Sequence, residues 1–125
     1  MNWDLYPNFG EDEFRCKHSG QCVMVPEFMA RLQRLRIAYG RPMTVTSGYR
    51  HPTHPIEAAK AAPGAHSTGR AVDIAVQGAD AVRLIAMAIA EGFTGIGVQQ
   101  KGNGRFIHLD DLPSGAFPRP TVWSY

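Results

Sequence analysis

The segment Gly64–Ile74 constrains the fold more than any other part of the chain, because it places His66 and Asp73 seven residues apart. Glycine, serine and threonine in its first half argue against a helix. From Ala71 onward the residues are mainly apolar and alternate, which predicts a strand. We therefore expect a loop that positions His66 and a strand that carries Asp73.

A second segment, Phe106–Asp110, also combines strand-forming residues with polar ones. Alternation along a strand places His108 and Asp110 on one face and Ile107 and Leu109 on the other. We therefore expect a strand with one apolar face and one face whose polar side chains, His108 and Asp110, belong to a functional site.

Together the two segments supply His66, Asp73 and His108 as candidate metal ligands. Imidazole nitrogens and carboxylate oxygens are ordinary zinc ligands, and three protein ligands leave the fourth position to water, as a catalytic zinc requires. The sequence therefore predicts a three-ligand zinc site.

The rest of the chain predicts an α+β fold, a small and mainly antiparallel sheet with flanking helices. The expected elements are a helix from residue 26 to a stop at Gly40, a helical turn at 58–62, a helix at 79–91, and strands at 43–47, 71–76, 95–98 and 105–109. Residues 1–25 are expected to form an arm with a short helical turn at 11–14, packed onto the body by its aromatic side chains. Residues 113–125 are expected to be an irregular tail docked by Trp123.

Length and composition favour one domain over residues 1–125, because 125 residues can bury a substantial core. A net charge of +2 is too weak to indicate nucleic-acid binding. No apolar run approaches the length of a membrane span, and Met1–Asp4 does not open a signal peptide. We expect a monomer made in the cytoplasm, which acts on a cell wall only after export or release.

Cys16 and Cys22 are too few for a disulfide scaffold. With His18 they could hold a second metal, but a reduced pair or a small disulfide loop is the favoured interpretation.

Four motifs in order resemble the zinc D-alanyl-D-alanine carboxypeptidase family, in the branch of phage endolysins and bacterial murein peptidases. The resemblance covers about residues 26–125, and its fold is shared with the hedgehog signalling domain. The motifs are Ser47-Gly48-Tyr49-Arg50, His66-Ser67-Thr68-Gly69-Arg70-Ala71-Val72-Asp73-Ile74, Gly95-Ile96-Gly97 and Phe106-Ile107-His108-Leu109-Asp110.

The resemblance implies that His66, Asp73 and His108 bind one zinc ion, and that the chain hydrolyses amide bonds in peptidoglycan peptide stems as a carboxypeptidase or an endopeptidase. It also implies that Arg50 holds the scissile carbonyl or pairs with a substrate carboxylate, since a guanidinium is permanently charged and forked. Ser67 and His54 are expected to contact the substrate at the edge of the site.

One departure from the family pattern concerns the general base. In the best-known members a carboxylate lies three residues before the last zinc histidine, and Arg105 occupies that position here. Asp110 is the expected substitute, although it could instead orient His108 or His66. Asp111 is a weaker candidate.

If no carboxylate serves as the base, the alternative is a non-catalytic zinc-containing domain that binds cell walls or builds a phage particle. A carboxypeptidase would also need a group that holds the terminal carboxylate of its substrate. Arg50, Arg70 and Arg105 are the candidates for this contact.

Overall fold

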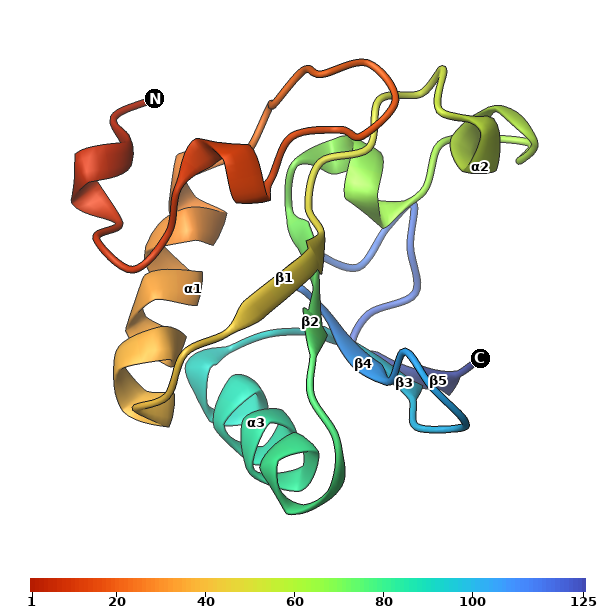
Figure 1. The fold of residues 1–125 in the computed structure, drawn as a ribbon. Coiled ribbons are helices and arrows are strands. Elements are labelled where there is room, and N and C mark those ends of the chain that lie inside the picture. The colour runs from red at the N-terminus through yellow and green to blue at the C-terminus, as the bar shows by residue number, and fades with distance from the viewer.

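A five-stranded sheet forms the centre of the computed structural model, which describes residues 1–125, and its strand order is β1-β2-β4-β3-β5 (Figure 1). The pairs β1–β2, β2–β4 and β3–β4 are antiparallel, whereas β5 pairs parallel with β3. The predicted α+β class is confirmed, with a mixed sheet. The strands are β1 (Thr44–Ser47), β2 (Ala71–Ala75), β3 (Gly95–Gln99), β4 (Phe106–Asp110) and β5 (Thr121–Ser124).

Two long helices, α1 (Pro26–Tyr39) and α3 (Gly78–Glu91), pack against each other beside the sheet (Figure 1). Helix α1 begins with Pro26 at its first position, where the missing N–H costs nothing, and ends at Gly40 in the left-handed conformation. These bounds confirm the predicted helices to within one residue. No helix has the length and apolar character that a membrane span needs.

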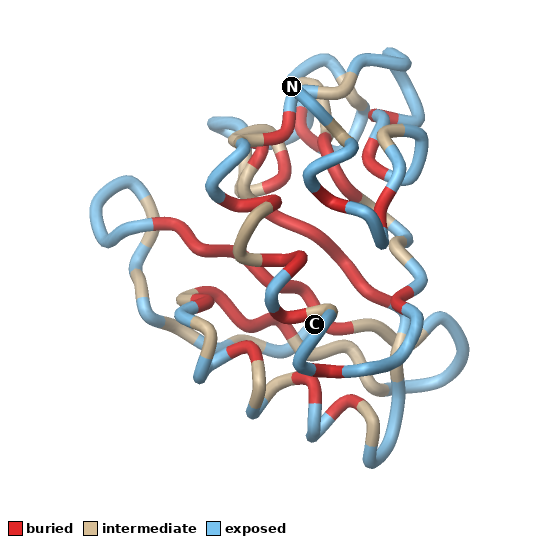
Figure 2. The backbone as a smooth tube through the Cα atoms, turned by 90° about the vertical axis from the view of Figure 1, so that its left-hand side faces the viewer, coloured by how far each residue is buried: buried red, intermediate tan, exposed pale blue.

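Alternation along the strands separates a core face from a polar face. Ile74, Ile96 and Ile107 belong to one hydrophobic core with both long helices, whereas Asp73 and His108 lie on the opposite face of their strands. Figure 2 shows the result, a buried strand layer surrounded by exposed loops. The fold therefore presents the two predicted strand ligands on the face that the long helices leave uncovered.

The N-terminal arm closes one end of this core. Phe9 and Phe14 are buried in it. The arm contains the expected turn as a 3₁₀ turn at Glu11–Glu13, and a second 3₁₀ turn at Trp3–Leu5 that the sequence did not predict. The Phe14 carbonyl accepts a hydrogen bond from the Tyr49 N–H at 2.9 Å. The arm therefore supports the segment that follows β1 and leads to Arg50.

Three local expectations were wrong. Residues 65–68 form a 3₁₀ turn, η3 (Ala65–Thr68), rather than an irregular loop. The helical turn expected at 58–62 is α2 (Pro55–Ala58), because His54 accepts a hydrogen bond from the Ile56 N–H and caps the turn earlier. The tail is not irregular throughout, since β5 extends the sheet by pairing with β3, a partner distant in sequence.

Candidate metal centre

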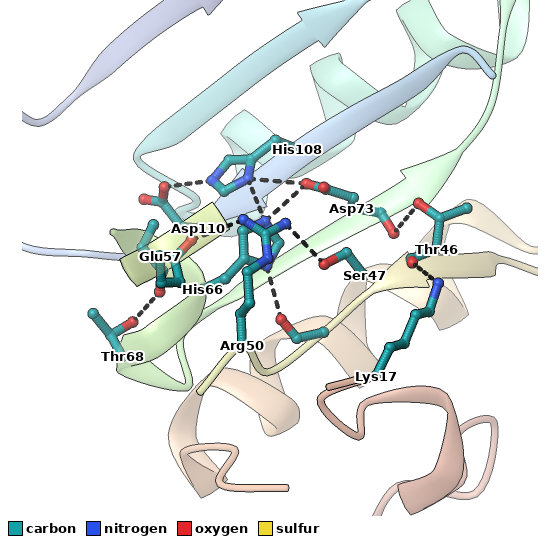
Figure 3. A network of polar contacts seen from close by, with 12 residues as sticks. Lys17, Thr46, Ser47, Arg50, Glu57, His66, Thr68, Asp73, His108 and Asp110 are labelled. Carbon is teal, nitrogen blue, oxygen red and sulfur yellow. Dashed lines mark hydrogen bonds and ion pairs between the residues drawn. The ribbon is translucent and has the colours of Figure 1, made fainter. Parts of the chain in front are cut away.

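Three buried side chains from separate elements converge on the polar face of the sheet (Figure 3). His66 comes from η3, and Asp73 and His108 are direct partners across β2 and β4. Asp73 Oδ1 lies 3.2 Å from His66 Nε2 and 3.0 Å from His108 Nδ1, and the two nitrogens are 3.3 Å apart. The structure thus brings together the three residues predicted as metal ligands.

Each histidine is held by its other ring nitrogen. His66 Nδ1 lies 2.7 Å from the Gly48 carbonyl oxygen, and His108 Nε2 lies 2.7 Å from Asp110 Oδ2. Both partners only accept hydrogen bonds, so both of these nitrogens carry protons. In the neutral rings the remaining nitrogens present lone pairs to the cluster, as metal-binding histidines do.

The cluster fits a small divalent metal ion. Two imidazole lone pairs and a carboxylate oxygen only 3.0–3.3 Å apart repel one another unless a proton or a cation lies between them. Tetrahedral ligands about 2.0–2.1 Å from zinc lie about 3.3–3.4 Å from one another, which is close to the observed spacing. Three ligands of this kind leave one position open.

Contacts within the cluster shift the pKa values of Asp73 and His108. Burial alone would raise the pKa of Asp73, but hydrogen bonds with His108 and His66 hold this pKa well below its usual range. Burial alone would lower the pKa of His108, but Asp110 and Asp73 raise it. The site therefore favours an ionised carboxylate with positive charge beside it.

Asp110 is fixed behind His108 by a second cation. Its side chain is fully buried, and Arg119 donates to both oxygens, from Nε to Oδ1 at 2.8 Å and from Nη2 to Oδ2 at 2.7 Å. Burial would raise the pKa of Asp110, but His108 and Arg119 outweigh it and lower this pKa to about 2. Asp110 thus contacts the histidine nitrogen that points away from the cluster, a geometry that favours the orienting alternative over the general base.

Two glycines of β3 make room for this arrangement. A Cβ at Gly95 would lie 2.3 Å from both carboxylate oxygens of Asp110, and a Cβ at Gly97 would lie 2.8 Å from the Trp123 ring and 2.9 Å from His108 Cβ. Both contacts are too short for any side chain. The Gly-Ile-Gly segment is therefore needed because its neighbours fill the space of its missing side chains.

The cluster opens into a cavity of about 670 Å³, within the size range of small-ligand sites. Polar and aromatic side chains from η3, the strands, the α2 region and the C-terminal tail surround it. Its lining includes His66, Asp73, His108, Arg50, Lys60, Arg119, Phe106, Phe117, Trp123 and Tyr125. A peptide that entered this cavity would meet the three candidate ligands.

Residues 7–110 match the family model described as peptidase M15. The chain belongs to the peptidase M15 family. The match includes the whole His-Asp-His cluster and confirms the resemblance to the zinc D-alanyl-D-alanine carboxypeptidase family. Membership of this family identifies the chain as a metallopeptidase. No curated protein matches the sequence.

Of the predicted substrate contacts in this M15 peptidase, only Arg50 lines the cavity. Its guanidinium is held by Ser47 Oγ at 3.1 Å and Glu57 Oε2 at 3.0 Å. Ser67 instead donates its hydroxyl to the Arg50 carbonyl oxygen at 2.6 Å, and His54 caps α2. Neither Ser67 nor His54 lines the cavity, so Ser67 supports the backbone of Arg50 rather than facing the space that a peptide would fill.

The other two candidate arginines of the M15 peptidase are also outside the cavity. Arg70 donates to both oxygens of the buried Asp111, at 2.8 and 3.1 Å, and Arg31 donates to the same carboxylate at 2.9 Å. Arg105 donates to the Gly102 carbonyl oxygen at 2.9 Å. These contacts give Arg70 and Asp111 a structural function and leave Arg50 as the candidate that faces the cavity.

Sequence reasoning missed Arg119, Glu57 and Lys60, which all contribute to the site. Arg119 lies in the tail, and the only signal for it was that a buried aspartate needs a cationic partner. Glu57 and Lys60 lie in a segment whose alanines and prolines obscured them. No sequence periodicity links Arg119, Glu57 or Lys60 to the strands that carry the candidate ligands.

The two cysteines are free, and they do not form a second metal site with His18. Cys16 is buried, and its sulfur accepts a hydrogen bond from the His51 N–H at 3.3 Å. The reduced pair is therefore the interpretation that agrees with the structure.

Proposed function

We propose that this chain is a zinc-dependent peptidase that hydrolyses amide bonds in the peptide stems of peptidoglycan, as a D-Ala-D-Ala carboxypeptidase or as an endolysin-type endopeptidase. The observation that carries the proposal is the meeting of three ligand atoms, within 4.8 Å of one another, at a cavity that can admit a peptide. A cell-wall substrate would require export or release of the chain.

His66, Asp73 and His108 would hold the zinc ion. Two imidazoles, one carboxylate and an open position suit catalytic zinc. When bound, the ion would polarise the scissile carbonyl and lower the pKa of a water molecule.

The protein's own side chains would orient the substrate. Arg50 lines the cavity, and its bonds to Ser47 and Glu57 use only two of its five N–H donors. Its remaining donors could bind the carbonyl on which negative charge develops, or a substrate carboxylate. Asp110 would act by holding the Nε2 proton of His108 and thereby keeping Nδ1 directed at the cluster.

One observation favours a second candidate, a non-catalytic domain of the same fold that binds cell walls or forms part of a phage particle. Asp73 is the only acidic side chain that lines the cavity, and it belongs to the ligand cluster. No further acidic side chain faces the cavity in the position of a general base.

The experiment that tests the proposal measures bound zinc and the release of amines from purified peptidoglycan, with and without a chelator. We expect about one zinc per chain and chelator-sensitive release, as a single three-ligand site requires. Asp73→Ala should lose both metal and turnover, whereas Arg105→Ala, outside the cavity, should retain both. Hydrolysis by the metal-free protein would refute the proposal, and zinc without hydrolysis would support the second candidate.

A further inference from the structure

Glu57 is a buried carboxylate that organises the segment between Arg50 and η3. Its side chain is fully buried, and Oε2 accepts from Arg50 Nη1 and Lys60 Nζ, both at 3.0 Å. Its other oxygen, Oε1, accepts from the Gly64 N–H at 2.7 Å. One side chain therefore fixes Arg50, the end of the α2 segment and the start of η3 relative to one another.

The consequence is an excess of positive charge at this end of the cavity. Arg50 and Lys60 both line the cavity, and they share a single oxygen of Glu57. Arg119, the third cation of the lining, is already paired with both oxygens of Asp110. A single buried carboxylate therefore compensates only one of the two charges that Arg50 and Lys60 supply.

Lys60 has unused capacity to bind an anion. An ammonium group has three N–H donors, and one of them is directed at Glu57. The Lys60 side chain is 44% exposed whereas that of Arg50 is 15% exposed, so Lys60 is the more accessible of the two cations. A solvated lysine paired with an exposed glutamate would be an ordinary surface feature. Here the glutamate is fully buried, and its single negative charge is shared between Arg50 and Lys60.

We propose that Lys60, held beside Arg50 by Glu57, binds a carboxylate of the peptide substrate, so that the chain prefers peptides with a free carboxylate close to the scissile bond. This inference rests on the proposed function. It assigns Lys60 a part in specificity rather than in the chemical step. Glu57 is then the positioning residue of this subsite.

The test compares stem peptides that differ only in having one carboxylate replaced by a carboxamide, with each carboxylate replaced in turn. The parent should lose about tenfold in kcat/KM, mainly through KM, when the recognised carboxylate is replaced, as a partly desolvated charge contact predicts. Lys60→Met should reduce this preference to less than about twofold, mainly by raising KM for the acid peptide. Lys101→Met, in the exposed turn between β3 and β4, is the matched control and should keep the parent's preference.

Calorimetric binding of the same peptides separates the two proposals. Tighter binding of the acid form by the parent, lost in Lys60→Met, supports the subsite even if no peptide is cut. The absence of cleavage alone refutes the peptidase. Equal binding of acid and amide by the parent, or an undiminished preference in Lys60→Met, refutes the subsite.

Discussion

Replacing Asp110 by asparagine separates its two candidate functions, because the variant keeps the shape of the side chain and removes its charge. Asp110 accepts from His108 Nε2 at 2.7 Å and from two nitrogens of Arg119. An amide has only one acceptor oxygen, so its NH₂ group must face an N–H donor of one of the two partners. We expect His108 to lose its fixed orientation in Asp110→Asn, or Arg119 to lose its buried partner.

The size of the effect follows from the pKa of Asp110, which is lowered from 3.8 to about 2. This shift corresponds to about 2 kcal/mol in favour of the ionised form in the folded protein. Because the pKa is depressed on folding, the contribution is present at neutral pH and is lost as the pH falls below about 4 toward 2. His108 and Arg119 share this contribution. The loss of a partner that orients a metal-binding histidine lowers metal affinity roughly 10- to 100-fold, which is the effect that we expect.

The assay is a zinc competition titration against a chromogenic chelator, followed by amine release at a zinc concentration that saturates both proteins. A positioning function predicts weakened zinc binding by Asp110→Asn and turnover within about tenfold of the parent once the site is saturated. Thermal unfolding with zinc present checks that both proteins are folded. Parental zinc affinity combined with a loss of about 10²–10⁴ in turnover would refute this reasoning, because a lost general base has that signature.

Two further predictions concern the surroundings of the site. Gly95→Ala should weaken zinc binding at least as much as Asp110→Asn in the same titration, because the added Cβ would lie 2.3 Å from the Asp110 carboxylate. Gly10→Ala, whose Cβ meets only Glu13 Oε2 at 3.8 Å, is the control, and parental affinity in Gly95→Ala would contradict the packing argument. Burial would raise the pKa of Glu57, but the Gly64 N–H, Lys60 and Arg50 lower this pKa from 4.5 to about 2. The ionised Glu57 side chain should therefore stabilise the folded protein fully above about pH 4.5, and this stabilisation should disappear toward pH 2. Urea unfolding at pH 6 and pH 3 should therefore show a smaller loss of stability at acid pH in Glu57→Gln than in the parent, by up to about 2 kcal/mol, and equal losses would exclude this contribution.

Local patterns were sufficient to predict much of the fold. Helix α1 could be predicted because Pro26 and Gly40 mark its ends, and β4 because its polar and apolar residues alternate. The candidate ligands could be predicted for a related reason, since Asp73 and His108 lie on strands whose alternation fixes the face they share. These features depend on neighbours in the sequence.

The features that sequence reasoning missed depend on contacts between distant segments. Strand β5 is four residues long and gains its partner only when the tail crosses to β3. No sequence periodicity therefore predicts this strand. The pairing of Arg119 with Asp110, and of Glu57 with Arg50, is likewise set by the folded backbone. Sequence spacing limits which residues can meet, but it does not rank Arg50, Arg70 and Arg105. The decisive difference is the partner that each arginine meets in the folded chain, which is Glu57, Asp111 and the Gly102 carbonyl respectively.

The geometry of the candidate ligands depends on both edges of the sheet. Strands β1 and β5 are the two edge strands, and the chain beside each of them supplies one contact that orients a histidine. The Gly48 carbonyl, directly after β1, holds His66, and Arg119, shortly before β5, holds the carboxylate that fixes His108. A change at either edge should therefore alter the angle between the two imidazoles as well as the stability of the fold. The tail, which has the weakest sequence signal in the chain, consequently helps to position the candidate metal ligands.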